Sequence, residues 1–394
     1  MENRPFIYLD NAATTSVRPE VLTAMEPFFK ESYANPASIY QFAQNTHKML
    51  DESRETIANC LGAKPQEIYF TGGGSEGDNW AIKGVAYALK DKGKHIITSK
   101  IEHHAVLHTC EFLEQQGFDV TYLDVDEDGL VTPEQLEAAI RPDTILVTIM
   151  AANNEIGTIE PIRELGAVAH KHGVLFHTDA VQAFAHIPIS VEEDNIDLLS
   201  ASGHKFHGPK GVGFLYIREG VKLPPLIHGG AQERSKRGGT HNMPGIVGMA
   251  TAAKLACEQM EKNAEQEKEL RDYLIQRLEQ EIPYVKVNGH RTKRLPNNVN
   301  VCFRFIEGES LLIMLDQKGI CGSSGSACTS GSLDPSHVLL AIGLPHEIAH
   351  GSLRMTLSEQ NTREEIDYTV DSLKTIVETL RSMSPLYEDF VKNN

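Results

Sequence analysis

A lysine and an aspartate at the ends of apolar segments have the residue types that an aldehyde cofactor requires. Lys205 lies in residues 202–211, where glycine and proline constrain the backbone between two apolar segments. A lysine so placed can form a Schiff base with an aldehyde once burial and nearby cations lower its pKa. Asp179 ends another apolar segment, where a carboxylate is costly unless it meets a cation such as a protonated pyridine nitrogen. The alternative for Lys205 is a solvated loop lysine, as most lysines are.

A glycine-rich turn at residues 71–76 could hold a phosphate group. Its small residues, before a predicted helix, let backbone N–H groups approach an anion at the positive end of the helix dipole. A plain tight turn fits the same residues. The turn lacks the Gly-Lys-Ser/Thr ending of a nucleotide P-loop and the spacing of a dinucleotide fingerprint, which favours another phosphate. Together with Lys205 and Asp179, it predicts a site for pyridoxal 5′-phosphate.

Cys328 lies in residues 321–332, where nearly every residue is small and polar. We expect such a segment to be mobile, so that one thiol can reach both an internal substrate and an external acceptor. Its thiolate would be the nucleophile, favoured by a nearby cation, for which His103 and the substrate adduct are the candidates. Wide spacing in a large chain favours reduced, mostly buried thiols for the remaining cysteines, which are Cys60, Cys110, Cys257, Cys302 and Cys321.

The elements that must position these residues follow the pattern of an α/β fold. From residue 68 to residue 217, short β-branched segments alternate with longer helical ones, as expected of a sheet built from crossover units. In open sheets of this kind ligands bind beyond the carboxyl ends of the strands, where Lys205 and Asp179 fall. We predict strands at residues 68–70, 95–98, 144–150, 174–177, 196–201 and 212–217.

A smaller second domain is predicted beyond a long charged helix at residues 250–281. Its elements would be a strand at 299–305 and helices at 309–318 and 363–381. The predicted division is a large domain, residues 16–255, and a small α+β domain, residues 1–15 and 256–394. The small domain would carry Cys328 on a loop at about residues 321–335.

Composition and charge restrict the class of partner. The chain has 394 residues, 41% of them hydrophobic, which is enough for a sizeable core. A formal net charge of −17 disfavours nucleic acid as a partner, because such binding rests on clustered Lys and Arg. Residues 1–5 show no signal peptide and no later stretch suits a membrane span, so we expect a cytoplasmic location. His104 and His108 have helical i, i+4 spacing, but no third ligand accompanies them, and no metal site is predicted.

Five ordered blocks resemble the signature blocks of the cysteine desulfurase family, whose members are class-V aminotransferase-like enzymes. They are YLDNAATT at residues 8–15, NNEIG at 153–157, HTDAVQ at 177–182, SGHK at 202–205 and GSACTSG at 325–331. The resemblance implies the aspartate-aminotransferase-like fold (fold type I), with a mostly parallel seven-stranded sheet, and a homodimer. It also implies conversion of L-cysteine to L-alanine, with the sulfur held as a persulfide on a cysteine.

The same resemblance implies roles for individual residues. Lys205 would bind the cofactor and move protons, Cys328 would take the sulfur, and His103 would stack on the ring and act in acid–base steps. Asp179 would keep the pyridine nitrogen protonated, and Arg354 would grip the substrate carboxylate. The remaining cofactor contacts would be Gly74, Ser75, Asn154, Gln182, Ser202, His204 and, from the other subunit, Thr240. Asn154 and Asn11 would also contact the substrate.

Three positions depart from the family pattern, and some alternatives stay open. Gly72 and Gly238 stand where serine is usual, and Tyr40 where histidine is usual. The sulfur acceptor is expected to be an iron–sulfur scaffold protein or another thiolation partner. Rival functions are a selenocysteine lyase or another lyase with the same cofactor, and a non-catalytic regulator. The regulator would need a basic DNA-binding module, which the acidic chain lacks.

Overall fold

A seven-stranded sheet is the largest feature of the computed structural model, which describes residues 5–324 and 335–393. In space the strands run in the order β2-β8-β7-β6-β5-β3-β4, and only β8 is antiparallel to its neighbours. Their bounds are β2 (Ile68–Thr71), β3 (His95–Ser99), β4 (Asp119–Leu123), β5 (Thr144–Thr148), β6 (Leu175–Asp179), β7 (Leu198–Ser202) and β8 (Gly213–Ile217). The predicted fold class, an α/β fold with a mostly parallel seven-stranded sheet, is confirmed.

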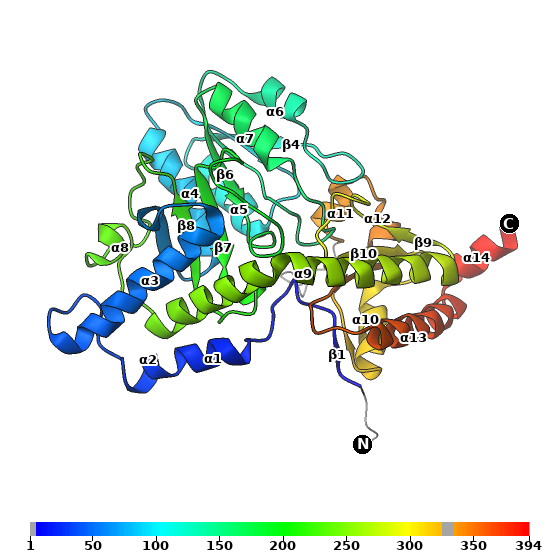
Figure 1. The fold of residues 1–394 in the computed structure, drawn as a ribbon. Coiled ribbons are helices and arrows are strands. Elements are labelled where there is room, and N and C mark those ends of the chain that lie inside the picture. The colour runs from blue at the N-terminus through cyan, green and yellow to red at the C-terminus, as the bar shows by residue number, and fades with distance from the viewer. Residues whose placement is uncertain (1–4, 325–334, 394) are drawn as a thin grey trace.

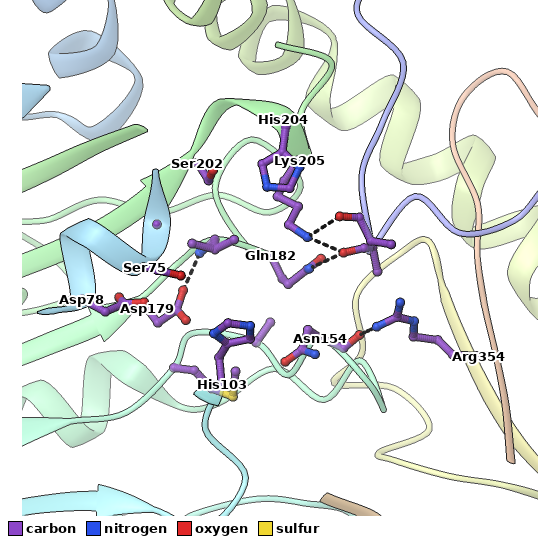
Figure 2. A pocket seen from close by; sticks show the side chains of 16 residues that line it. Ser75, Asp78, His103, Asn154, Asp179, Gln182, Ser202, His204, Lys205 and Arg354 are labelled. Atoms are coloured by element: carbon purple, nitrogen blue, oxygen red, sulfur yellow. Dashed lines mark hydrogen bonds between the residues drawn. The ribbon is translucent and has the colours of Figure 1, made fainter. Parts of the chain in front are cut away.

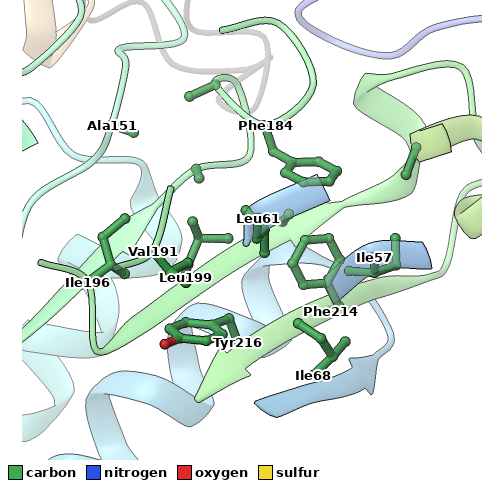
Figure 3. Close-up of a cluster of buried hydrophobic side chains, with 14 of the residues drawn as sticks. Ile57, Leu61, Ile68, Ala151, Phe184, Val191, Ile196, Leu199, Phe214 and Tyr216 are labelled. Carbon is green, nitrogen blue, oxygen red and sulfur yellow. The ribbon is translucent and has the colours of Figure 1, made fainter. Parts of the chain in front are cut away.

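Helices cover both faces of this sheet, which explains why its central strands are apolar throughout. Adjacent residues point to opposite faces: Leu198 packs in one apolar cluster and Leu199 in the other. The first cluster lies under α4 (Gly74–Leu89) and α5 (His104–Glu114). The second lies under α3 (Gln44–Leu61), α7 (Ile162–Lys171) and the long helix α9 (Met243–Glu281). Figure 3 shows part of the second cluster, including Phe184 and Phe214. Their rings pack edge to face, with the ring centroids 5.0 Å apart.

A second core forms around a three-stranded antiparallel sheet, in the order β12-β10-β9. Its strands are β9 (Val285–Val287), β10 (Asn298–Phe303) and β12 (Ser352–Thr356), and its main helices are α10 (Gly308–Gln317) and α13 (Arg363–Ser382). Close to it, β1 (Ile7–Tyr8) pairs in parallel with β11 (Ile320–Cys321), so the N-terminal segment joins this half of the molecule.

Helix α9 belongs to both cores and runs across the molecule (Figure 1). Its Ala253 and Ala256 pack against the large sheet, whereas Leu274 and Leu278 pack in the second core. The helix therefore crosses the boundary expected at residue 255 without a break, and the division into residues 16–255 and the remainder stays a prediction. The helix also begins earlier than expected, at Met243, because the Asn242 side chain accepts a hydrogen bond from the Gly245 N–H and caps it.

Shorter elements complete the described chain. They are the helices α1 (Pro19–Met25), α2 (Pro27–Lys30), α6 (Pro133–Ala139), α8 (Gln232–Ser235), α11 (His337–Ala341), α12 (His346–Ala349) and α14 (Pro385–Asn393), with 3₁₀ turns η1 (Gln41–Ala43), η2 (Pro65–Glu67) and η3 (Gly203–Lys205). Strand β4 was not predicted. It is an edge strand whose side chains are mostly half-exposed, so it lacks the apolar pattern of the buried strands.

Candidate active site

A cavity of about 410 Å³ opens beyond the carboxyl ends of the parallel strands (Figure 2). It brings together most of the predicted site residues, which are Gly74, Ser75, His103, Asn154, Asp179, Gln182, Ser202, His204, Lys205 and Arg354. These residues come from both halves of the molecule, since Arg354 lies on β12 and the others end or follow strands of the large sheet. The predicted site is thus assembled from residues 74 to 354 by the fold.

Lys205 reaches the cavity from a tight turn, η3, directly after β7. Its Nζ donates to the carbonyl oxygens of Ala12, at 2.5 Å, and Ala13, at 2.9 Å. A Cβ at Gly208 would come within 2.7 Å of the Gly203 carbonyl oxygen, so only glycine lets the chain fold back this closely. Lys205 is therefore held at a fixed place beside the N-terminal segment.

Asp179 ends β6 and is 4% exposed. Burial raises the pKa of its carboxyl to about 6, although a hydrogen bond from the Val181 N–H and the charge of Lys205 work against this shift. A buried carboxylate with a raised pKa is stabilised by any cation brought next to it. A protonated ring nitrogen in the cavity would supply that cation, so Asp179 fits a pyridine ring.

Sequence reasoning missed two further buried carboxyl groups, Asp78, which lines the cavity, and Glu102, which does not line it but directly precedes His103. Burial is the main cause that raises the pKa of Asp78 well above its ordinary value and that of Glu102 to about 8. Asp78 lines the cavity, and its Oδ1 is buried without a hydrogen-bond partner among the described residues. A weak signal existed in the sequence, because Asp78 follows Gly74 by one helical turn and Glu102 directly precedes His103.

One end of the cavity suits a phosphate group. A second cavity of about 470 Å³ shares Gly74, Ser75, Ser202 and His204 with the first. Helix α4 begins here without a side-chain cap, so its N-terminal N–H groups face an open space that favours an anion. A Cβ at Gly74 would lie 2.5 Å from Val181 Cγ2, so a larger residue at position 74 would collide with that side chain. Lys205, the buried Asp179 and the anion-binding end of the cavity together fit pyridoxal phosphate.

His103 caps helix α5 rather than lying within it. Its Nδ1 accepts a hydrogen bond from the Ala105 N–H at 3.1 Å, so the neutral ring carries its proton on Nε2. Burial, followed by the charge of Lys205, lowers the pKa of His103 to about 4. In this structure the lowered pKa therefore favours a neutral His103 near neutral pH, and a positive charge on His103 for a thiolate stays a prediction. A neutral ring remains suited to stacking on an aromatic cofactor.

Arg354 is almost fully buried, at 2% exposure, and its guanidinium is fixed by two contacts. Nη1 donates to the Asn154 carbonyl oxygen at 3.0 Å, and Nη2 lies 2.9 Å from Oδ1 of Asp10. Nε is buried without a partner among the described residues. A guanidinium with a remaining N–H at the cavity can bind a carboxylate.

Two predicted residues that the structure describes, Asn11 and Thr240, do not line this cavity. The Asn11 amide donates to the Thr356 carbonyl oxygen and borders a separate cavity of about 30 Å³. Thr240 lines another one, of about 60 Å³, beside Gly72. Cys328 lies outside the described residues.

The segment before Thr240 is held by a buried ion pair that sequence reasoning missed. Glu233 is 4% exposed and accepts hydrogen bonds from both Arg54 Nη atoms at 2.8 Å and from the Phe70 N–H. Although burial acts in the opposite direction, the hydrogen bonds from Arg54 and His241 lower the pKa of Glu233 to about 2. Glu233, Arg234 and Ser235 all have positive φ, at 46°, 56° and 62°, a conformation that costs each about 1–2 kcal/mol. The ion pair thus fixes a strained turn.

Lys205 and the buried Asp179 line one cavity at the edge of a mostly parallel seven-stranded sheet. Together with the likeness to solved structures, this arrangement identifies the fold as fold type I, the aspartate-aminotransferase class. The model of the family "Aminotransferase class-V" matches residues 7–369, and the chain belongs to this family, among its cysteine desulfurases. Members of this family are in general dependent on pyridoxal phosphate.

Relatives and solved structures agree with this assignment. The chain is 58% identical over 380 residues to "Cysteine desulfurase IscS" of Methanosarcina thermophila, covering 96% of this chain and 94% of the relative. It is 49% identical over 383 residues to "Cysteine desulfurase" of Nostoc sp., covering 97% and 96%. A solved "NIFS-LIKE PROTEIN" superposes with a TM-score of 0.90 at 41% identity, over 95% of this chain and all of that one. "SspA in complex with cysteine" gives a TM-score of 0.81 at 41% identity, over 90% of this chain and 100% of that one.

Proposed function

We propose that this protein is a cysteine desulfurase that uses pyridoxal 5′-phosphate to convert L-cysteine to L-alanine. The sulfur passes to Cys328 as a persulfide and then to an acceptor protein, for iron–sulfur cluster assembly or another thiolation. The observation that carries the proposal is the convergence of Lys205, Asp179 and Arg354 on one cavity, in a chain 58% identical to a relative named cysteine desulfurase. When bound, pyridoxal phosphate withdraws electrons from the bonds at the α-carbon of an amino acid.

The residues of the large sheet hold the cofactor in this proposal. Lys205 binds its aldehyde carbon and afterwards carries protons at Nζ, where the carbonyl oxygens of Ala12 and Ala13 already accept hydrogen bonds. Asp179 keeps a proton on the ring nitrogen. Gly74, Ser75, Ser202 and His204 surround the phosphate. His204 does so as a neutral ring, because burial and the charge of Lys205 lower its pKa to about 4.

Arg354 and Asn154 orient the substrate at the other end of the cavity. Arg354 binds the carboxylate of cysteine, and this fixes which bonds at the α-carbon face the ring. His103 covers the ring face and donates from Nε2, because its Nδ1 is occupied by the Ala105 N–H. In this arrangement the neutral imidazole excludes water above the ring without carrying a charge.

The described residues on either side of Cys328 support its role as sulfur acceptor. Ser323 is paired through its backbone with Arg354, the proposed substrate arginine. On the other side, the Ser336 hydroxyl donates to the carboxylate of Glu155, the neighbour of Asn154. Of the described residues that flank positions 325–334, Ser323 thus contacts Arg354, which lines the cavity, and Ser336 contacts Glu155, which adjoins the cavity residue Asn154.

A homodimer completes the site in this proposal. Thr240 does not line the cavity of its own chain, which is consistent with a role at the phosphate of a second copy. Large apolar side chains are also exposed close together in the sequence, namely Leu22, Phe29, Tyr33, Ile39, Tyr40 and Phe42. A second copy would cover such a surface.

The cellular setting is proposed to be the cytoplasm. None of the helices that the structure describes combines the length and the apolar character needed to cross a bilayer.

No group of three or more His, Cys, Asp or Glu in the described part of the chain is arranged to hold a metal ion.

The function is tested by adding L-cysteine to protein purified with pyridoxal phosphate. Alanine should accumulate, and without a reductant about one sulfur per chain should remain bound at Cys328, located by mass spectrometry. Cys328→Ala should bind the cofactor normally but hold no sulfur. If this variant transfers sulfur as fast as the wild type, Cys328 is not the acceptor. If the wild type forms no alanine from cysteine but does so from selenocysteine, the protein is a selenocysteine lyase.

A further inference from the structure

An internal carboxylate already contacts the arginine that is proposed to bind the substrate. Asp10 Oδ1 lies 2.9 Å from Nη2 of Arg354, and the Asp10 side chain is 18% exposed while that of Arg354 is 3% exposed. With Nη1 donating to the Asn154 carbonyl oxygen, both ends of the guanidinium are engaged. A ligand carboxylate that binds Arg354 must therefore share it with Asp10 or replace it.

The backbone around Asp10 is fixed, so this contact is not the chance position of a loose side chain. Thr356, two residues beyond Arg354 on β12, donates its N–H to the Leu9 carbonyl oxygen at 2.7 Å. Its hydroxyl accepts from the Ala12 N–H at 2.8 Å. Asp10 itself forms a bridge with Thr356. The N-terminal segment thus presents Asp10 to Arg354 and, two residues later, the Ala12 carbonyl to Lys205.

The charges that face Asp10 determine how it responds to a second carboxylate. Burial raises its pKa, and the positive charges of Arg354 and Lys205 oppose that shift. The other titratable neighbours are Tyr8 and Cys321, whose own pKa values Asp10 helps to raise, so both are neutral near pH 7. A ligand carboxylate at Arg354 would add a negative charge beside Asp10 and weaken its ion pair. Both effects favour the protonated form of Asp10.

We propose that Asp10 competes with the ligand carboxylate for Arg354, weakens the binding of both L-cysteine and L-alanine, and takes up a proton when either binds. The inference rests on the proposed function, because it takes Arg354 as the carboxylate site. Asp10 acts through Arg354 and is a positioning residue. Its benefit to the reaction is release of the product, since alanine carries the same carboxylate as cysteine and would otherwise leave slowly.

The test uses L-alanine as the probe, because it has no thiol and gives no turnover. Its binding to the cofactor-loaded dimer is measured by titration calorimetry at pH 7.5, in two buffers of different ionisation enthalpy. The wild type should take up about one more proton on binding than Asp10→Asn, because the proton changes at the amine of L-alanine are common to both proteins. Asp10→Asn should also bind L-alanine about tenfold more tightly, which is the effect of one pKa unit of repulsion. Asp91→Asn, a change at an exposed site after α4, should match the wild type.

Each other outcome has a defined meaning. Unchanged or weaker alanine binding in a folded Asp10→Asn protein contradicts the proposal, because Asp10 would then only support Arg354. If that variant does not fold, Asp10→Glu replaces it: proton uptake should persist, and its loss contradicts the proposal. Arg354→Lys should lose alanine binding in every background. A wild type that binds neither L-alanine nor L-cysteine would instead contradict the proposed function itself.

Discussion

Nζ of Lys205 lies 2.9 Å from the carbonyl oxygen of Ala13, so residues 192 positions apart in the chain meet at the proposed reactive amine. The same N-terminal segment binds the Gln182 amide through the Ala12 carbonyl oxygen, and it holds Arg354 through Asp10. Ala12 and Ala13 therefore line the proposed active site, although the N-terminal segment belongs by its strand pairing to the second core.

The buried ion pair of Glu233 predicts a large loss of stability on removal of one charge. Glu233→Gln should lower the free energy of unfolding by about 3–5 kcal/mol, because Arg54 is left buried without its partner. Chemical denaturation measures the difference. Glu219→Gln, which removes the exposed partner of Lys64, is the matched control and should leave the stability unchanged. Equal effects of the two variants would show that the Arg54 pair does not fix the turn.

The lowered pKa of Glu233 predicts that the stability of the fold depends on pH in the acid range. The Glu233 carboxylate has its pKa lowered to about 2 in the folded protein, so its stabilising effect is present above its ordinary pKa of 4.5 and is lost as the pH falls from there towards 2. Denaturation curves between pH 5 and pH 3 should therefore show a smaller loss of stability in Glu233→Gln than in the wild type. Parallel curves for the two proteins would contradict this origin of the acid sensitivity.

The raised pKa of Glu102 predicts that stability falls as the pH rises, which is opposite to the effect of Glu233. Burial raises the pKa of Glu102 to about 8 from 4.5, so the folded protein keeps a proton that the unfolded chain releases. Its protonated form is favourable at low pH, and stability should decline as the pH rises from 4.5 to about 8. Glu102→Gln should lack this decline and gain stability relative to the wild type at pH 8. Unfolding curves of both proteins at pH 5 and pH 8 measure this decline in stability. An unchanged decline in the variant would exclude Glu102 as its cause.

Gly72 and Gly238, where the family resemblance leads us to expect serine, should differ in their tolerance of serine. A Cβ at Gly238 would lie 2.7 Å from the Gly229 Cα, a backbone atom, whereas at Gly72 it would meet the end of the flexible Glu76 side chain. Gly238→Ser should cost about 1–3 kcal/mol of stability, and Gly72→Ser should cost little. Thermal melts of both variants, with the wild type as reference, provide the comparison. A stable Gly238→Ser protein would mean that the backbone at 228–229 can move.

Much of this site could be predicted from single segments of the sequence. Lys205, Asp179 and the turn at 71–76 each end or follow an apolar strand, and parallel strands bring such ends to one edge of a sheet. The role of Arg354 needed the family resemblance, because an arginine within a short strand has no distinctive local pattern.

Other parts could not be predicted because they depend on contacts between distant segments. Asp10 meets Arg354 only through the pairing of the N-terminal segment with β12, and nothing in residues 8–15 indicates this. Asp78 and Glu102 become notable only when the fold buries them. The ion pair of Arg54 and Glu233 joins α3 to a turn 179 residues later.

The central claim is that Lys205 carries pyridoxal phosphate in this cavity. Reduction of the purified, cofactor-loaded protein with borohydride, followed by peptide mapping, should find the reduced cofactor attached to Lys205 and to no other lysine. Lys205→Ala should show no attached cofactor after the same treatment. A reduced cofactor on a different lysine, or none on the wild type, would contradict the assignment of this site.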